Sequence, residues 1–294
     1  MAVVNTNINA SVAQNALARN ERAMNTAMER LSTGQRINSA SDDAAGLAIS
    51  SRMTSQIRGL ETGIRNANDA ISMISTADGA LIEITNMLQR MRELALQSAT
   101  GTTTSADRDY LNQEYQNLVL EIERIAQNTQ WNGKSILEGT ANGTSSTVKF
   151  QVGANGGQTI AVNFGNVSQD GGSGGTIFSS FEKSAAGAAF HISGATAAVA
   201  IASAATTLGK IDSAITVVNS QRATFGAAMN QLTYAVDNLS NVKVNAEGSR
   251  SRVLDTDYAK ETSELARTQI IQQAGTAMLA QANQLPQTVL SLIQ

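Results

Sequence analysis

Residues 208–239 read LGKIDSAITVVNSQRATFGAAMNQLTYAVDNL, and the apolar residues in this stretch recur at spacings of three and four. They are Leu208, Ile211, Ile215, Val218, Phe225, Met229, Leu232, Val236 and Leu239. Arg222 breaks the rhythm in the middle of the stretch. Because this spacing lines one face of a helix with apolar side chains, it requires a partner helix to cover that face. The stretch therefore predicts a long helix within a coiled coil or helical bundle.

Two segments upstream carry the same apolar rhythm. In the first it runs through Leu60, Ile64, Ala67, Ile71, Ile74, Leu81, Leu88 and Ala95, and in the second through Leu111, Tyr115, Leu118, Ile122 and Ile125. A helix over residues 58–99 would be about 63 Å long at about 1.5 Å per residue, far longer than a typical globular helix. The connections between the segments are short, which favours antiparallel neighbours. We therefore expect residues 45–99, 105–128 and 203–245 to pack as one antiparallel bundle.

Turn and capping residues mark where these helices begin and end. Ser39–Asp43 offers N-cap side chains for the first long helix, and Gly101–Ser105 ends it. Ser105–Asp107 is expected to cap the helix that follows, and Asn245–Gly248 is expected to loosen the last long helix.

Both ends of the chain carry a thinner apolar stripe at strict seven-residue spacing. The N-terminal stripe is Val3, Ala10, Leu17, Met24 and Leu31, and the C-terminal stripe is Ile271, Met278, Leu285 and Leu292. The surrounding residues are rich in Ala, Asn, Gln and Thr, so each helix is weak alone. We therefore predict that the two ends pair and that these apolar residues, apart from Ala10, form an assembly core.

The centre of the chain changes character. Residues 139–195 are rich in Gly, Ser, Thr and Asn. Within them Val148, Phe150 and Val152 alternate with polar residues, as do Ile160, Val162 and Phe164, and Gly153–Gln158 separates the two runs. This pattern predicts a β-hairpin, and Asn132-Gly133 predicts a second tight turn just before it. The fold class is thus mainly α, a long antiparallel helical bundle with a small β-hairpin region.

Composition excludes several classes of function. The 294 residues include no Cys, so thiol chemistry is not expected. The net charge is −3, so a nucleic-acid surface is not expected. The chain has one Pro. No apolar run approaches the roughly 20 residues needed to span a bilayer, so membrane insertion is not expected. The N-terminus lacks the basic and apolar regions of a Sec-type signal peptide.

No group of residues suggests catalysis. His191 stands alone in the Gly- and Ala-rich centre, without a Cys or a second His to form a site. Asp42-Asp43 and Asp255-Thr256-Asp257 are better interpreted as helix caps than as cation ligands. Gly171–Gly175 lacks the strand-to-helix context of a phosphate-binding loop. We therefore predict no catalytic residue, no metal site and no cofactor, and a protein that is not an enzyme.

Distinctive strings of residues stand at both ends of the chain and along the first long helix. Quoted as they stand here, they are NTNIN (5–9), ERLSTG (29–34), RIN (36–38), ASDDAAGLA (40–48), LQRMRELA (88–95), Arg252, DYA (257–259), QIIQQAG (269–275) and LAQANQ (279–284). With these strings the chain resembles bacterial flagellin. Their length and order make the resemblance specific, and it covers nearly the whole chain.

The resemblance implies an architecture with an inner layer, called D0, and an outer layer, called D1. It divides the chain into an N-terminal D0 helix (1–44), D1 helices with the hairpin (45–165), a short variable surface region (166–200), a long D1 helix (201–254) and a C-terminal D0 helix (255–294). The variable region is too short for a packed domain of its own, so a smooth filament with a small outer projection is expected.

The resemblance also implies function and partners. A flagellin is the homopolymer subunit of the extracellular filament that drives swimming, and it is exported by the flagellar type III apparatus without a cleaved signal peptide. An export chaperone would bind residues 255–294, and filament cap and hook-junction proteins would contact the growing polymer. The two alternatives are a hook–filament junction protein and a secreted enzyme with flagellin-like ends, and polymerisation would separate both from a flagellin.

Host innate receptors read members of this family. The positions that correspond to contacts with Toll-like receptor 5 are Gln89, Arg90, Leu94 and Glu114. Met91 stands where a valine is common in the family. The C-terminal residues Val289, Leu290, Leu292 and Ile293 resemble the stretch read by NAIP-type inflammasome receptors, although the ending Ile293-Gln294 departs from the common pattern.

Overall fold

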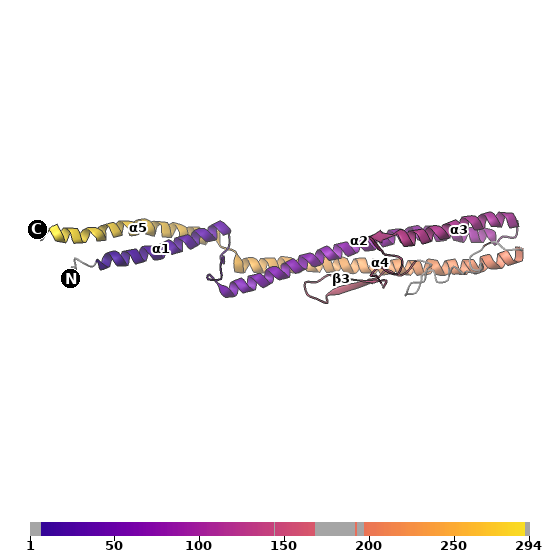
Figure 1. Ribbon diagram of the computed structural model, residues 1–294, viewed down its shortest axis with the longest axis horizontal. Coiled ribbons are helices and arrows are strands. Elements are labelled where there is room, and N and C mark those ends of the chain that lie inside the picture. The colour runs from indigo at the N-terminus through magenta and orange to yellow at the C-terminus, as the bar shows by residue number, and fades with distance from the viewer. Residues whose placement is uncertain (1–6, 144, 168–191, 193–196, 292–294) are drawn as a thin grey trace. The chain divides into compact units, whose positions relative to one another are not determined.

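The computed structural model describes residues 7–143, 145–167, 192 and 197–291, and it is mainly helical (Figure 1). Its helices are α1 (Ile8–Thr33), α2 (Ala44–Ser98), α3 (Ser105–Asn128), α4 (Ala197–Leu254) and α5 (Tyr258–Ser291). Its strands are β1 (Gln130–Trp131), β2 (Lys134–Ser135), β3 (Thr147–Gln151) and β4 (Thr159–Asn163). Val3, His191, Leu292, Ile293 and most of the predicted variable region lie outside the described residues.

The chain forms two compact units, whose boundaries fall inside α2 and α4. One unit combines Met1–Ile57 with Val244–Gln294, and the other is Arg58–Lys243. We call the first the terminal unit and the second the bundle unit. Among the described residues, no helix combines the length and the apolarity that crossing a bilayer requires.

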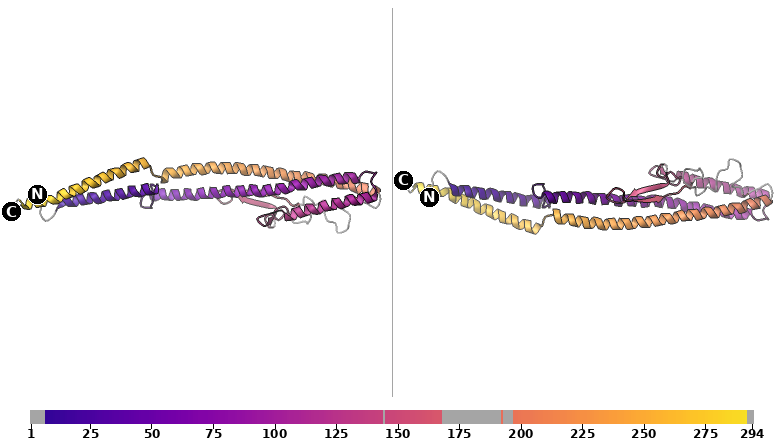
Figure 2. Two further views of the ribbon diagram at one scale, coloured as in Figure 1. Left: turned by 90° about the horizontal axis from the view of Figure 1, so that it is seen from above. Right: turned by 90° about the horizontal axis from the view of Figure 1, so that it is seen from below.

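The bundle unit is built from three helices that share one apolar core. The largest side chains that are fully buried there come from all three helices and from the segments around the strands: Tyr115, Phe164, Phe225, Ile74, Leu81, Ile84, Leu88, Met91, Leu94 and Ile136. Within this unit α4 runs alongside α2 in each view (Figures 1 and 2). Ion pairs join α2 to α4, Asp78 to Arg222 at 2.9 Å and Arg92 to Asp212 at 2.7 Å. The antiparallel bundle predicted from the apolar spacing is confirmed.

The two predicted turns are also confirmed. β3 pairs antiparallel with β4, with Val148 opposite Val162 and Phe150 opposite Ile160. β1 pairs with β2 through Asn132 and Gly133, whose φ values are 50° and 76°. Positive φ at both central residues is the geometry that Asn-Gly favours, because its twist matches that of the flanking strands.

The helix ends differ from expectation at two places. The N-cap of α3 is Thr104 rather than a residue of Ser105–Asp107, and Asp107 completes a reciprocal capping box with it. α4 continues without a break through Asn245–Gly248 to Leu254. A single helical glycine costs only about 1 kcal/mol, which the turns on either side offset.

Arg108, a buried arginine on α3, caps the C-terminal end of α2, and no pattern in the sequence predicted this contact. Arg108 of α3 is 2% exposed and donates from Nε to the Ser98 carbonyl at 3.0 Å and from its second guanidinium nitrogen to the Thr100 carbonyl at 3.0 Å. The Ser98 carbonyl is one that the end of a helix leaves without an intrahelical donor, and the Thr100 carbonyl lies in the turn that follows. The cation also complements the negative end of the helix dipole.

Candidate functional site

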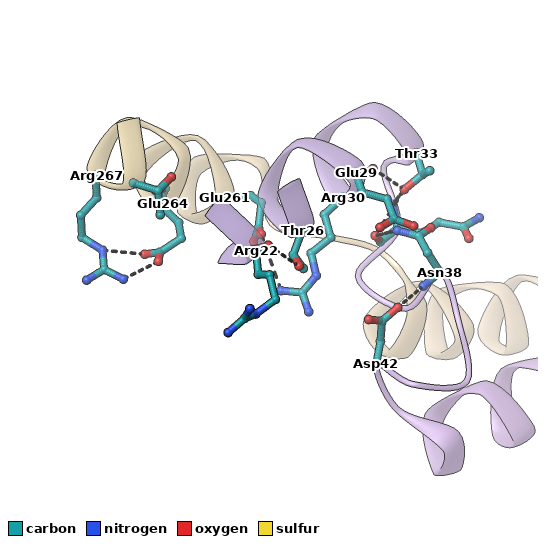
Figure 3. Close-up of polar contacts among 12 residues, drawn as sticks. Arg22, Thr26, Glu29, Arg30, Thr33, Asn38, Asp42, Glu261, Glu264 and Arg267 are labelled. Carbon is teal, nitrogen blue, oxygen red and sulfur yellow. Dashed lines mark hydrogen bonds and ion pairs between the residues drawn. The ribbon is translucent and has the colours of Figure 1, made fainter. Parts of the chain in front are cut away.

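α1 and α5 lie side by side in the terminal unit and run antiparallel; we call them the terminal pair (Figure 1). Polar contacts hold them at three levels. Asn7 Nδ2 donates to the Ala282 carbonyl at 2.8 Å, and Asn20 Nδ2 donates to the Thr268 carbonyl at 2.7 Å. Nearer the other end, Arg30 lies 3.6 Å from Glu261 (Figure 3). The predicted pairing of the two ends is confirmed within the described residues.

The terminal pair leaves much of its apolar surface in water. On α1 only Ala10 and Ala27 are buried, and Leu17, Met24 and Leu31 are half-buried. On α5 Ile271 is 42% exposed and Met278 is 67% exposed. Further exposed apolar side chains on the two helices are Ile8, Val12, Met28 and Ile270. The described members of the predicted assembly core, Leu17, Met24, Leu31, Ile271 and Met278, therefore lie on the pair, but one chain alone does not cover them.

An apolar groove lies between the two helices. Its volume is about 530 Å³, and it is lined by Asn9, Val12, Ala13, Ala16, Leu17, Ile271, Gly275, Met278, Gln281 and Ala282. At Gly275 the helices approach closely, since a Cβ added there would lie 2.6 Å from Leu17 Cδ2. Gly275 is thus the point at which Leu17 packs directly on the backbone of α5.

Three hydrogen bonds join the end of α1 and the residues just after it to the connection between α4 and α5. Gly34 ends α1 in the left-handed conformation, with φ 69°, and its carbonyl accepts from Thr256 N at 3.1 Å. Arg36 N donates to the Leu254 carbonyl at 2.7 Å, and the Arg36 guanidinium donates to the Val253 carbonyl at 2.7 Å. No pattern in the sequence predicted these hydrogen bonds; the one available signal is Gly34, a residue type that commonly ends a helix.

Two of the four aspartates interpreted as helix caps, Asp43 and Asp257, cap helices next to the terminal pair. Asp43 Oδ1 accepts from Gly46 N at 2.8 Å at the start of α2, and Asp257 Oδ1 accepts from Ala259 N at 3.0 Å at the start of α5. Asp42 instead closes the turn before α2: it accepts from Asn38 N at 3.1 Å (Figure 3). It also accepts from Ser39 N at 2.9 Å. The hydrogen bonds from Ser39 are the main cause that lowers the pKa of Asp42. Among the described residues, no cluster of His, Cys, Asp or Glu could hold a metal ion.

The four residues expected to meet an innate receptor do not all reach the surface of the bundle unit. Arg90 on α2 lies 2.8 Å from Glu114 on α3 and 3.0 Å from Glu93 on its own helix. The hydrogen bond that Arg90 donates to Glu114 is the main cause that raises the pKa of Arg90. Gln89 and Glu114 are exposed, whereas Leu94 is 1% exposed and belongs to the core.

The residues expected to meet an inflammasome receptor lie at the end of the chain. Val289 and Leu290 fall within α5, as does Leu285 of the predicted assembly core. Leu292 and Ile293 lie outside the described residues.

Both helical ends match known families. Residues 4–142 match the bacterial flagellin N-terminal helical region, and residues 208–293 match the bacterial flagellin C-terminal helical region. The chain belongs to the bacterial flagellin family. Flagellins are structural, non-enzymatic proteins that polymerise into the extracellular filament of the bacterial flagellum, so the alternative of a secreted enzyme is set aside.

Curated relatives match this flagellin along nearly its whole length. Flagellin A of Vibrio cholerae serotype O1 is 37% identical across 99% of both chains, and the flagellin of Halalkalibacterium halodurans is 42% identical across 99% of this chain and 100% of that one. The first alignment spans 379 residues and the second 292. The Vibrio protein therefore carries residues that this 294-residue chain lacks, which identifies the chain as a short form.

Two solved structures of flagellar proteins are similar to parts of this chain. The crystal structure of Bacillus cereus flagellin is 33% identical and covers 60% of this chain and 88% of that one, with a TM-score of 0.46. A putative flagellar hook-associated protein from Vibrio parahaemolyticus covers 73% of this chain and 100% of its own, with a TM-score of 0.53. At 20% identity this second likeness shows a shared fold alone, whereas both ends of the chain match flagellin itself.

Proposed function

We propose that the terminal pair is the surface through which subunits of this flagellin pack in the filament core, and that its helices order fully only on assembly. The observation that carries the proposal is the exposed apolar surface of the pair, with Met278 67% and Val12 63% exposed beside an apolar groove. Packing against neighbouring copies would remove these side chains from water. Each large apolar side chain that becomes fully buried contributes about 1.5–3 kcal/mol.

The weakness of the pair in a single chain supports the same proposal. The only buried residues of α1 are two alanines, so little apolar burial offsets the entropy that is lost when the helices order. Helices that depend on tertiary packing for stability are marginal without it. Because the terminal helices would be weak in the monomer, free monomers would not associate with one another. Subunits would then add only at the end of an existing filament.

Seeded reassembly with limited proteolysis tests this directly. In the monomer we expect rapid cleavage within residues 8–33 and 258–291, and in the filament we expect both ranges to be protected. Peptides from the bundle unit serve as the internal control, since their protection should be the same before and after assembly. Terminal helices already protected in the monomer, or failure to polymerise on seeds, would refute the proposal and favour a hook–filament junction protein.

The same apolar surface would serve the flagellar partners. The export chaperone would cover α5 within residues 255–294 before assembly, and the filament cap and hook-junction proteins would contact the terminal pairs at the filament ends. A chain with both Ile271→Ser and Met278→Ser should lose chaperone binding in a pull-down. Retained binding would place the chaperone on another surface.

A second proposed role is recognition by Toll-like receptor 5 at the exposed cluster of Gln89, Arg90 and Glu114. The two ion pairs of Arg90 hold its guanidinium at the surface where α2 meets α3. Because Leu94 is buried beneath this surface, its role would be to support the backbone of α2 rather than to contact the receptor.

Replacing Arg90 tests the receptor proposal. Arg90→Ala should abolish activation of a Toll-like receptor 5 reporter while leaving the urea unfolding midpoint nearly unchanged, because exposed ion pairs contribute little to stability. Arg92→Ala is the matched control, since Arg92 lies on the same helix as Arg90 and also forms an exposed ion pair, with Asp212 of α4. Unchanged activation by Arg90→Ala, or an equal loss with Arg92→Ala, would show that the receptor binds elsewhere.

For the C-terminal stretch we propose recognition by NAIP-type inflammasome receptors through Val289, Leu290, Leu292 and Ile293. Delivery of the protein into reporter cells should activate the inflammasome, and a double Val289→Ala, Leu290→Ala variant should reduce the response. An unchanged inflammasome response to that variant would refute the proposal.

A further inference from the structure

The chain contains three Asn-Gly pairs, Asn132-Gly133, Asn142-Gly143 and Asn155-Gly156, and all three asparagines are exposed. In such a pair the glycine backbone nitrogen can attack the side-chain amide carbon of the asparagine. Ammonia leaves, a five-membered succinimide forms, and water opens the ring to aspartate or isoaspartate. Glycine favours the reaction because it has no Cβ to crowd the attacking nitrogen. The surroundings of each pair decide whether the folded chain permits the attack.

Two of the pairs are held in conformations that oppose the reaction. The Gly143 N–H donates to the Thr140 carbonyl at 2.7 Å, so the attacking nitrogen is already engaged. Asn132 and Gly133 form the two-residue turn between β1 and β2, where both have positive φ and Trp131 pairs with Lys134. Closing a succinimide there would require rotation of the Asn132 backbone and loss of the turn.

The third pair lies in the loop that connects β3 and β4, and it is freer to react. No hydrogen bond in the described part of the chain holds the Asn155 side-chain amide or the Gly156 N–H. A Cβ added at Gly156 or Gly157 would meet nothing within 4 Å, so these two glycines have room to move. The Asn155 backbone itself is held, since its N–H donates to Gln158 Oε1 at 3.1 Å.

One contact in the loop also favours the chemistry. Gln151 Nε2 donates to the Asn155 carbonyl at 2.6 Å. That carbonyl belongs to the peptide bond between Asn155 and Gly156. The Gly156 nitrogen of this bond must lose its proton before it attacks the side-chain amide carbon of Asn155. A donor on the oxygen stabilises the negative charge that the deprotonated peptide delocalises onto it.

The loop is also the part of the hairpin that packs tightly on α2. A Cβ added at Gly63 would lie 2.6 Å from the Val152 carbonyl oxygen, and one added at Gly59 would lie 3.0 Å from Ala154 Cβ. Asn66 Nδ2 donates to the Gln151 carbonyl at 3.0 Å, and the strands lie beside α2 (Figure 2). Isoaspartate adds a methylene to the main chain directly after these contacts, so its formation would shift Val152 and Ala154 away from α2.

We propose that Asn155 is a site of spontaneous deamidation, and that its conversion to aspartate or isoaspartate loosens the β3–β4 loop from α2. The reaction releases one ammonia and consumes one water for each asparagine, so it needs no oxidant and no enzyme. The product is a carboxylate at the edge of a hollow of about 570 Å³ that Arg58, Thr62 and Asn66 also line. Conversion would accumulate with the age of a subunit and mark older flagellin chemically.

Peptide mapping by mass spectrometry tests the site. The folded chain is incubated at mildly alkaline pH in water enriched in heavy oxygen, and conversion is followed at each of the three pairs. We expect conversion at Asn155 to be severalfold faster than at Asn132 or Asn142, and this ranking to vanish when the chain is incubated in urea. Equal or faster conversion at Asn132 or Asn142 in the folded chain would overturn the proposal.

Two variants separate the chemistry from its structural effect. Gly156→Ala should slow conversion at Asn155 severalfold without harm to the fold, because the added Cβ has open space and Gly156 does not have positive φ. After ageing, the wild-type loop should be cleaved faster by a protease than the loop of an equally aged Asn155→Ala chain. Unchanged conversion in Gly156→Ala would refute the succinimide route, and equal cleavage of the two aged chains would refute loosening of the loop.

Discussion

Replacing Gly275 by Val should abolish filament formation by this flagellin while the bundle unit stays folded. The added Cβ would lie 2.6 Å from Leu17 Cδ2, and two further methyl groups would extend into the same space. Overpacking of this kind costs about 1–3 kcal/mol, a large share of what a weak helix pair can supply. Val is also a better helix former than Gly, so α5 alone would not lose helical stability. The expected loss therefore comes from the contact between α1 and α5.

Sedimentation of seeded reassembly mixtures and electron microscopy provide the measurement for Gly275→Val. Thr276→Val is the matched control, because it introduces the same side chain at the next, exposed position of α5 and should leave assembly intact. Adding Leu17→Ala to Gly275→Val removes the clashing atoms and should restore at least part of the filament yield. Normal filaments from Gly275→Val alone would show that α1 and α5 separate or shift in the polymer.

Truncating Phe225 should have the largest effect on the stability of the bundle unit. Phe225 on α4 is fully buried, and its ring centroid lies 5.4 Å from that of Phe164 at an interplanar angle of 53°. Replacing a buried Phe by Ala costs about 3–5 kcal/mol, because transfer energy is lost and a cavity remains. The tilted aromatic pair adds about 0.5–1.5 kcal/mol to what is lost. Phe225→Ala should therefore lower the free energy of unfolding by several kcal/mol.

Urea unfolding followed by the fluorescence of Trp131 measures this change, since the chain has one Trp and it packs against the bundle core. Tyr234→Ala is the matched control, because Tyr234 is an aromatic residue on the same helix that is 75% exposed. Its effect should stay within about 0.5 kcal/mol, as for most surface substitutions. Equal shifts in the two variants would mean that the contact between Phe164 and Phe225 does not stabilise the unit.

Periodic patterns made most of the helical architecture predictable. The stripe from Leu208 to Leu239 predicted α4 and its partner, because a helix with one apolar face cannot stay stable without a covering surface. The hairpin and the Asn132-Gly133 turn were predictable because turn chemistry acts over a few neighbouring residues. The cap of α3 was misplaced by one residue, since Thr104 and Ser105 offer similar hydroxyl groups and only backbone geometry separates them.

The candidate sites were less predictable than the fold. The sequence identified Leu17 and Met278 as members of the two terminal stripes, but the stripes alone do not tell how far each residue is covered. The resemblance of the chain to the family grouped Leu94 with Arg90 and Glu114 as a receptor contact. Leu94 is only 1% exposed, however, so it belongs to the core of the bundle unit. Exposure depends on every helix that packs nearby, and a pattern on one helix does not contain that information.

The sequence by itself determined the family, the helical period of each segment and the pairing of two weak terminal stripes. The tertiary structure alone decided that Leu17 packs on the backbone of Gly275, that Arg36 bonds to the carbonyl groups of Val253 and Leu254, and that Arg108 ends α2. The first group follows from forces between residues close in the chain, which repeat with the period of the helix. The second joins residues that packing alone brings together, so their contacts depend on distances that no local pattern encodes.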